Sequence, residues 1–581
     1  MARWRWEMAD GAGLAGSAVA AAYSPLLARV LWARGLRTPE ACAAWLGLRR
    51  AALPAWEALP DLPVAVERVA AAVTAGQPVA VFGDYDVDGL AAAAILVLTL
   101  RAHGVPVTWH VPDRLRDGYG LNAAAVETLA GWLRAHQPAG RPLLVVVDCG
   151  TSNAAEIDLA GRLGLDVVVL DHHAINEADL PPALALVNPK RGDRSYPYRE
   201  LTAAGLACYL ARGLLARVPL PGPAAAGEAL KRDILALAAL GTAADVAPLT
   251  GDNRVLVAWG LRALRTRQRP GLRALMRAAG VEPGALTAEA LVWRLAPRLN
   301  AAGRMRDPVI ALRLLLTDDP AEAAALAAQL DALNRQRQRE LERILSEARA
   351  GMAQVGRARI PVLADDGWSP GLVGLVAGRL AEEIGRPVIV LGADGELARG
   401  SARSQAGFNI TAALAACGHL LERYGGHSQA AGLTVRRTQL GALRAALDDL
   451  ADRTWPDGPP EPVLILDGAA RLAEFRRDAV ADLACLEPFG RQNEEPLWLV
   501  ERVRLLEARP VGAGGHHLQL RITDGVAVHT AIAFRHGPRR DELLAARWLD
   551  LACVARLSSW QGQERVELQV RDVRPVAAPS P

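Results

Sequence analysis

Three aspartates occupy every second position in the stretch VFGDYDVDG, at Asp84, Asp86 and Asp88, directly after an apolar run. Carboxylates this close repel one another, and burial would return protons to some of them, so we expect a cation beside them. A solvated acidic turn is the simplest alternative, because Asp and Gly both suit turns. A calcium loop of the EF-hand type is excluded, since its last ligand position requires a glutamate and is Ile95 here.

Further polar residues follow other apolar runs. LLVVV leads to Asp148, DVVVL leads to Asp171, His172 and His173, and the apolar stretch DILALAAL precedes Asp245. Carboxylates with an imidazole and no thiolate favour Mn²⁺ or Mg²⁺ over structural zinc. Two such ions, about 3.5–4 Å apart, would hold and deprotonate a water for in-line attack on phosphorus. Each Asp alone is explained by a helix cap or a turn, but the whole set favours a metal site.

The second histidine of the HH pair has a different expected role. Adjacent side chains on an extended backbone point apart, so His173 is not expected to bind the same ion as His172. Orientation of a ligand, or stabilisation of developing negative charge, suits His173 better.

Alternating strands and helices would position these groups. From Pro78 onward the short β-rich runs VAVF, VPVTWHV, PLLVVVD and LDVVVLD are each followed by a helical stretch. This alternation predicts an α/β fold with a parallel sheet and helices on both faces. Sites in such sheets form beyond the carboxyl ends of the strands, where the acidic residues stand.

Other elements are predicted on either side of this sheet. Short helices should begin after Ser24 and Thr38, each with proline at its first position. A long helix from Pro320 should lead to a second α/β segment between Ile360 and Ala451. The linker TWPDGPPEPV precedes alternating runs that predict a small β-barrel.

Composition narrows the class of protein. The net charge is only +3 over 581 residues, so nucleic-acid binding would need local basic clusters. The only lysines, Lys190 and Lys231, do not follow glycine, which excludes the phosphate loop of nucleotide-driven motors. The six cysteines are scattered and fit reduced thiols, and strongly apolar stretches long enough for a membrane span are missing. We therefore expect a cytoplasmic protein.

Four stretches carry a resemblance to a known family. VFGDYDVDG, VVVDCGTSN, LDHHAI and GTAADVAPL resemble, in this order, the four motifs of the DHH phosphoesterases. VPDRLRDGYGLN, RLNAAGRM and YGGHSQAAG are similar to the bacterial exonuclease branch that degrades single-stranded DNA from its 5′ end, and the likeness covers nearly the whole chain. This resemblance implies 5′-mononucleotide products, a setting in DNA repair and recombination, and a monomer that works with a single-strand-binding protein and a helicase. One departure is GRQNEEP, where Gln492 and Glu494 replace the family's Gly and Pro.

The resemblance also implies roles for particular residues. Two Mn²⁺ or Mg²⁺ ions would be held by Asp84, Asp86, Asp88, Asp148, His172 and Asp245, with His173 and Asp148 as the catalytic residues. The division of the first three carboxylates between the two ions stays open. The expected DNA-binding residues are Arg114, Tyr119, Asn300, Arg304, Ser401, Arg403 and His427.

Physical chemistry agrees with some of these roles. The planar fork of Arg114 suits a 5′-terminal phosphate, alongside Ser401 and Arg403. Tyr119 would stack on a base, with a buried core tyrosine as the alternative. Arg304, with Asn300, is expected in a polar loop beside the long helix, where it would contact the DNA backbone or form an ordinary surface ion pair.

Pattern and resemblance together predict five segments. They are an N-terminal helical segment (1–60), a DHH phosphoesterase domain (61–305), a connecting long helix (306–355), a DHH-associated α/β domain (356–455) and an OB-fold barrel (460–575).

Two other functions compete with the exonuclease. One is a DHH phosphodiesterase for short oligoribonucleotides or cyclic dinucleotides, which would need no extended track such as the barrel and the VPDR stretch provide. The other is a non-catalytic single-strand-binding scaffold, which should have lost part of the acidic set, whereas every member is present here.

Overall fold

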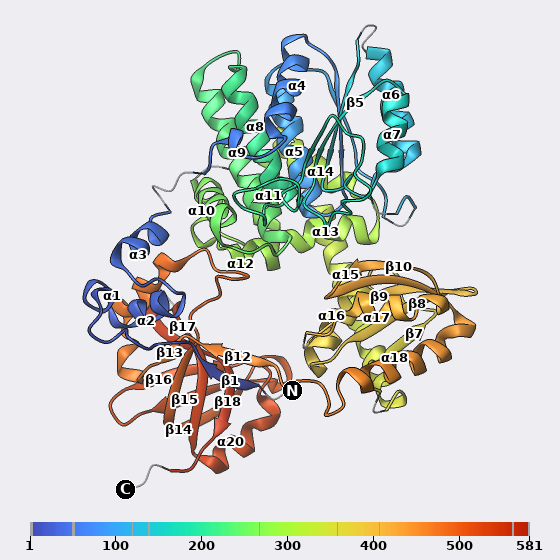
Figure 1. Cartoon of the computed structure of the whole chain (residues 1–581). Helices are drawn as coiled ribbons and strands as arrows, with labels where there is room; N and C mark the ends of the chain where they lie inside the picture. Colours follow the sequence, from blue (N-terminus) through green and yellow to red (C-terminus); the bar gives the residue numbers. More distant parts are fainter. Residues whose placement is uncertain are drawn as a thin grey trace.

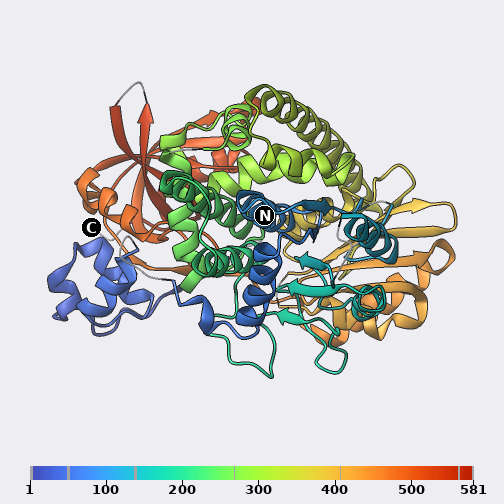
Figure 2. The ribbon, with the colours of Figure 1, turned by 90° about the horizontal axis from the view of Figure 1, so that it is seen from above.

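The structure is a computed structural model that describes residues 4–48, 53–114, 116–118, 120–136, 140–266, 268–356, 358–405, 407–560 and 563–578. Three bodies are visible in Figure 1: an α/β domain above, a second α/β domain at the lower right, and a barrel at the lower left. The view from above in Figure 2 places the barrel and the second α/β domain on opposite sides. Across the described ranges, every helix is too short or too polar to span a membrane.

The first domain is built on a five-stranded parallel sheet in the order β3-β2-β4-β5-β6. Its strands are β2 (Val79–Gly83), β3 (Val107–His110), β4 (Leu143–Val147), β5 (Asp166–Leu170) and β6 (Ala185–Val187). Strands β2 and β4 are buried along their whole length, which explains their unbroken apolar sequences. The predicted α/β fold is confirmed. Strand β6 was not predicted, because its three residues lie in a proline-rich stretch without a longer apolar run.

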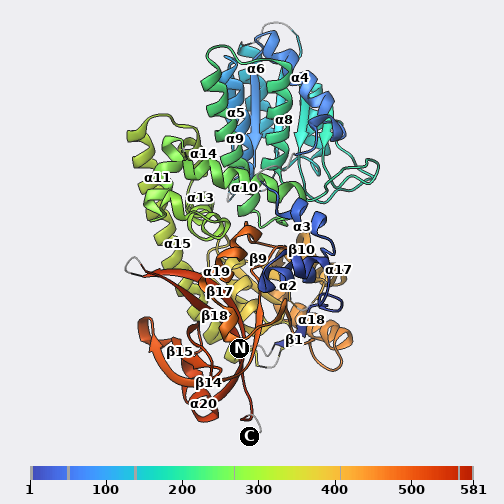
Figure 3. The same cartoon turned by 90° about the vertical axis from the view of Figure 1, so that its left-hand side faces the viewer.

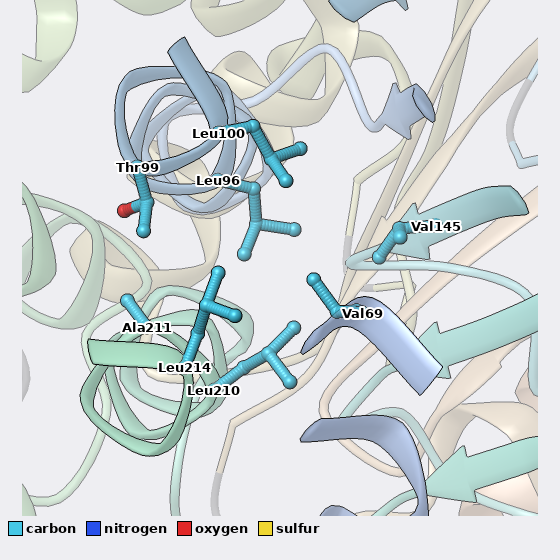
Figure 4. Close-up of a pocket in the computed structure, with 8 residues that line it drawn as sticks. All are labelled: Val69, Leu96, Thr99, Leu100, Val145, Leu210, Ala211 and Leu214. Carbon is cyan, nitrogen blue, oxygen red and sulfur yellow. The ribbon is translucent and has the colours of Figure 1, made fainter. Parts of the chain in front are cut away.

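Helices cover both faces of this sheet and form two cores. One face carries α4 (Leu62–Thr74), α5 (Val87–Ala102), α8 (Ala203–Arg217) and α9 (Ala224–Ala244), and the other α6 (Ala123–His136) and α7 (Ala154–Arg162). A void of about 10 Å³ lies between α4, α5, α8 and β4, and Figure 4 shows the residues that line it. The Thr99 hydroxyl at its wall donates to the Ile95 carbonyl at 2.7 Å, so the void has an apolar lining and is a packing gap.

Further helices of this domain are α10 (Gly251–Thr266), α11 (Pro270–Ala278), α12 (Ala288–Ala290), α13 (Ala296–Met305) and α14 (Val309–Leu316). The predicted long helix is α15 (Pro320–Gln354), which descends from this domain in Figure 3. It packs on the second domain through α16 (Val373–Ile384).

The second domain has a five-stranded mixed sheet in the order β10-β11-β9-β8-β7. Its strands are β7 (Val362–Asp365), β8 (Val388–Asp394), β9 (Leu397–Arg403), β10 (Leu421–His427) and β11 (Ala430–Arg436), and its other helices are α17 (Ile410–Ala416) and α18 (Leu440–Thr454). Only β7 and β8 pair in parallel among the described strands of this sheet.

The C-terminal barrel is also confirmed. It comprises β14 (Trp498–Val511), β15 (His517–Thr523), β16 (Val528–Ala533), β17 (Trp548–Trp560) and β18 (Gln563–Pro575), and it closes because β14 pairs with both β15 and β17. The predicted N-terminal helices, α2 (Pro25–Ala33) and α3 (Pro39–Leu46), share one hydrophobic core with this barrel. The chain ends therefore form one body, and β1 (Arg5–Met8) pairs with β12 (Val463–Leu466) beside it.

One arginine connects this body to the first domain. Arg254 of α10 is 2 % exposed, and its guanidinium lies 3.4 Å from the centre of the Trp45 ring. Its Nη1 donates to the Trp45 carbonyl at 2.6 Å and its Nη2 to the Leu486 carbonyl at 3.1 Å. These bonds join α10 to the N-terminal helices and to the segment that leads into the barrel.

Candidate metal centre

The DYDVDG stretch turns the end of β2 into the start of α5. Asp84 follows the strand and is buried, and Asp86 caps the helix by accepting from the backbone N–H of Asp88 at 2.9 Å and of Gly89 at 3.2 Å. Gly89 permits this tight turn, because a Cβ there would lie 2.7 Å from the Asp84 carbonyl oxygen. Asp84 and Asp86 are thereby held at the carboxyl edge of the sheet.

Asp88 is placed differently from its two neighbours. Its Oδ2 accepts from the backbone N–H of Ala203 at 2.7 Å and its Oδ1 from that of Ala204 at 3.1 Å. Both donors belong to the first turn of α8, where a carboxylate is favoured by the helix dipole. Gly241 of α9 allows the approach, since a Cβ there would lie 2.6 Å from Asp88 Oδ1. Asp88 thus joins three helices beneath the site.

The backbone is strained at one acidic residue and directly after another. Asp148, directly after β4, has φ +62°, and Val246, directly after Asp245, has φ +53°. A left-handed conformation costs about 1–3 kcal/mol at residues other than glycine, and such strain concentrates at functional sites. Asp245 stands at the C-terminal end of α9, as the sequence predicted.

The HH pair does not have the geometry predicted for it. The rings of His172 and His173 lie with their centres 4.8 Å apart and are tilted toward each other by 54°, so they do not point apart. The prediction was wrong because the chain is no longer extended after β5. Asp171 Oδ1 accepts from the backbone N–H of His172 at 2.7 Å and of His173 at 3.2 Å, which folds both residues around one carboxylate.

Asp171 is a residue whose role the sequence did not assign. Its Oδ1 also bonds His173 Nδ1 at 2.7 Å, and its Oδ2 accepts from the Thr151 backbone N–H at 3.0 Å. Burial is the largest single influence on Asp171 and opposes its charge, but the His173 hydrogen bond, the charges of both histidines and the contact with Thr151 together outweigh burial and lower the pKa of this carboxyl. Burial likewise opposes the His173 charge, but the bond to Asp171 and the charges of the surrounding aspartates together raise the pKa of His173 to about 9. The role of Asp171 could have been predicted from its position at the end of β5, directly before two histidines, because a carboxylate there can orient a histidine ring.

The ligand atoms of four chain segments meet at one point. Candidate ligand atoms of Asp84, Asp86 and Asp148 lie within 4.8 Å of one another, as do those of Asp148, His172 and His173. His172 Nε2 is 3.2 Å from Asp148 Oδ1, and His172 Nδ1 is 4.0 Å from Asp245 Oδ2. Asp148 belongs to both groups, which is the arrangement expected of a carboxylate between two ions.

The electrostatics of this cluster call for cations. Burial and the mutual repulsion of the acids raise the pKa values of Asp84, Asp148 and Asp245 well above normal. Burial lowers the pKa of His172 to about 3, so its ring is neutral and can offer a nitrogen lone pair to a metal ion. Among the described residues, no donor reaches the buried Oδ1 of Asp84. A divalent ion would relieve the repulsion and occupy this oxygen, so the residues fit a metal site.

Arginines gather at one flank of the cluster. The Arg114 guanidinium lies 5.3 Å from the centre of the Tyr85 ring, and Arg403 of β9 donates to the Ser401 hydroxyl. Burial lowers the pKa of Arg304 to about 10, and the charge of Arg114 adds to the effect. Within the part of the chain that the structure describes, none of the three arginines pairs with a carboxylate. The unneutralised positive charge of this flank therefore favours binding of an anion.

The remaining predicted DNA-binding residues have different positions. Arg304 and Asn300 lie on helix α13, so the predicted loop is wrong. Gly303 misled the prediction: it serves close packing, since a Cβ there would lie 3.3 Å from the Tyr85 carbonyl. Arg304 Nη1 donates to the Gly371 carbonyl of the second domain at 3.1 Å. His427 ends β10 and is exposed, and Tyr119 lies outside the described residues.

Comparison with known proteins gives a consistent assignment. Family models match residues 78–242 (DHH family, N-terminal domain), 354–453 (DHHA1 domain) and 466–572 (RecJ OB domain). The chain is 36% identical over 575 residues to the single-stranded-DNA-specific exonuclease RecJ of Thermus thermophilus, covering 99% of this chain and 77% of the relative. It is 34% identical over 532 residues to RecJ of Dickeya dadantii, covering 88% of this chain and 90% of the relative.

The chain belongs to the RecJ family. Two solved RecJ structures from Thermus thermophilus resemble the fold over 99% of this chain. The RecJ complex with Mn²⁺ has a TM-score of 0.81 at 33% identity, with 80% of that chain covered. The RecJ complex with Mg²⁺ has a TM-score of 0.74 at 32% identity, with 79% covered.

Proposed function

We propose that this member of the RecJ family is a metal-dependent exonuclease that hydrolyses single-stranded DNA from its 5′ end and releases 5′-mononucleotides. The observation that carries the proposal is the convergence of Asp84, Asp86, Asp148, His172 and Asp245 from distant parts of the sequence. A single-stranded-DNA-specific activity is named for relatives that align with most of this chain.

These five residues would hold two Mn²⁺ or Mg²⁺ ions, with Asp148 between them. When bound, the ions supply a water of low pKa and neutralise charge on the scissile phosphate. Asp88 would act as a positioning residue, because both its oxygens already accept from α8. His173, held by Asp171, would donate a hydrogen bond to the phosphate oxygen on which negative charge develops.

The arginine flank would select the 5′ end. Arg114 and Arg403, with the Ser401 hydroxyl, offer forked and single donors to a terminal phosphate, which carries more charge than an internal one. Arg304 bridges the two α/β domains at this point, and His427 with Asn300 would line the strand's path. Binding the terminal phosphate beside the ions would place the next phosphodiester over them.

The other parts of the chain would guide the strand. We assign hydrolysis to the segment 61–305, closure of the site to 356–455 through the helix of 306–355, and strand binding to the barrel of 460–575 with the N-terminal segment 1–60 beside it. The same proposal places the enzyme in the cytoplasm, in DNA repair and recombination, as a monomer with a single-strand-binding protein and a helicase as partners.

Digestion of end-labelled DNA tests the proposal. With Mn²⁺, a 5′-labelled single strand should release labelled mononucleotide at once, whereas a 3′-labelled strand should shorten gradually. Chelation should stop both reactions, and Asp148→Ala should abolish hydrolysis while strand binding persists. Faster turnover of a dinucleotide than of a long strand would favour the small-substrate phosphodiesterase instead, and equal digestion of blunt duplex would contradict single-strand specificity.

A further inference from the structure

Lys190 lies at the carboxyl edge of the sheet, beside the HH pair. Strand β6 pairs in parallel with β5, with Val187 opposite Leu170, so the residues after the two strands run side by side. The Asp171 N–H donates to the Val187 carbonyl at 3.1 Å, which continues this pairing one residue further. The turn Asn188-Pro189-Lys190 therefore leaves the sheet next to Asp171-His172-His173.

A buried asparagine fixes this turn to the site. Asn188 is fully buried, and its Nδ2 donates to the His173 carbonyl and to the Thr151 hydroxyl, both at 3.0 Å. Its Oδ1 accepts from the backbone N–H of Lys190 at 2.8 Å. Arg199 Nη2 donates to the Lys190 carbonyl at 2.8 Å. The backbone of Lys190 is thus held by the same network that orients His173.

The Lys190 ammonium lacks the carboxylate partners that its neighbour has. Arg191 is bound by Asp61 and by Asp193, the latter at 2.7 Å. Within the described ranges, no carboxylate lies within ion-pairing distance of Lys190, whose side chain is only partly exposed. The other lysine, Lys231, is exposed and pairs with Glu228 at 2.8 Å on the surface of α9.

Lys190 and the arginine flank lie on different sides of the acidic cluster. Arg114 follows β3 and Lys190 follows β6, and these are the two edge strands in the order β3-β2-β4-β5-β6. The acidic and imidazole groups after β2, β4 and β5 lie between these edges, so the proposed ion positions separate the two cations. The charge of Lys190 also acts on Asp245, where it opposes the rise in pKa that burial and neighbouring acids cause.

We propose that Lys190 binds the backbone phosphate that follows the scissile phosphodiester on its 3′ side. This inference rests on the proposed function. If the arginine flank holds the first, 5′-terminal phosphate and the ions hold the second, scissile phosphate, a strand that continues past the ions meets Lys190 with its third phosphate. Hydrolysis breaks the bond between the second phosphorus and the 3′ oxygen of the first nucleoside. The second phosphate then stays on the shortened strand, and Lys190 retains that strand for the next cycle.

Substrates of different length test this position directly. A 5′-phosphorylated dinucleotide has only the first and second phosphates, so Lys190→Ala should leave its kcat/KM at the wild-type value. A 5′-phosphorylated strand of six nucleotides has the third phosphate, and its kcat/KM should fall about tenfold, as expected for loss of one charge-assisted hydrogen bond. Lys190→Arg should restore most of the loss, and Lys231→Ala is the matched control, with no change on either substrate.

A neutral phosphate identifies the contact. In the six-nucleotide strand, a methylphosphonate at the third phosphate should cost wild-type enzyme about tenfold and cost Lys190→Ala nothing more. The slope of log Kd for strand binding against log salt concentration should also decrease by about 0.7 in Lys190→Ala.

Three results would overturn the inference. They are an equal loss on the dinucleotide, a methylphosphonate loss that adds fully to that of Lys190→Ala, and wild-type kinetics of Lys190→Ala on the long strand. A wild-type enzyme that hydrolyses neither substrate with Mn²⁺ would instead refute the proposed function.

Discussion

Replacing Asp171 by asparagine should disable the site without removing any proposed ion ligand. The carboxylate accepts four hydrogen bonds, three at Oδ1 from His172 and His173 and one at Oδ2 from Thr151. An asparagine keeps one acceptor oxygen, so its amide N–H₂ must face at least one of these donors. Asp171→Asn therefore keeps the size of the side chain and removes its charge.

The magnitude follows from these contacts. Loss of the Thr151 bond costs about 1.5–3 kcal/mol, because the acceptor is charged. The imidazolium of His173, bonded at 2.7 Å, also loses its buried partner, a change that costs about 3–5 kcal/mol when it leaves a charge uncompensated. Because both energies describe the same local network, they are not simply added, and we expect the native arrangement of the HH pair to be destabilised by about 4 kcal/mol. We also expect Mn²⁺ affinity or turnover to fall about 10–100-fold.

Mn²⁺ titration and strand hydrolysis measure this effect together. Asp171→Asn should require more Mn²⁺ for half-maximal activity and should show lower kcat at saturating Mn²⁺. Asp193→Asn is the matched control, because Asp193 is 43% exposed and, among the described residues, its ion pairs are with Arg191 and Arg194 of the same loop. The reasoning is refuted if Asp171→Asn binds Mn²⁺ and hydrolyses single strands like the Asp193→Asn control.

Other substitutions test the supporting structure. Gly89→Ala should lower stability by about 1–3 kcal/mol and weaken Mn²⁺ binding through its clash with Asp84, whereas Gly131→Ala, with open space around it on α6, should stabilise by about 0.5–1 kcal/mol in thermal melts. Leu96→Ala, beside the void of Figure 4, should destabilise the first domain by about 3 kcal/mol in denaturant unfolding, and unchanged unfolding would show that the core is looser than described. Arg254→Met should loosen the body formed by the chain ends, visible as faster hydrogen exchange in residues 25–46, and unaltered exchange there would count against the role given to this arginine.

The sequence predicted the parts of the fold that local patterns determine. Buried parallel strands leave unbroken apolar runs, so four of the strands in the first sheet and the acids that follow them were predictable. The long helix α15 was predictable from its start at Pro320, and the barrel strands were predictable from their alternating pattern. The union of the N-terminal helices with the barrel was not, because it joins residues separated by more than four hundred positions.

The detailed roles of the polar residues depend on tertiary contacts. Asp88 looks equivalent to Asp84 in the sequence, yet it bonds the start of α8, more than one hundred residues away. The tilt of His172 and His173 depends on hydrogen bonds to Asp171 that no spacing rule encodes. Gly303 suggested a loop, but it lies within helix α13. Glycine suits this helical position because the Tyr85 backbone approaches it closely.

A crystal of this protein soaked in Mn²⁺ and measured at the manganese absorption edge would test the central claim most directly. We predict two anomalous peaks, one beside Asp84 and Asp86, the other beside His172 and Asp245, with Asp148 contacting both. A map from an active preparation that shows no peak among these side chains, or ions bound elsewhere, would contradict the account.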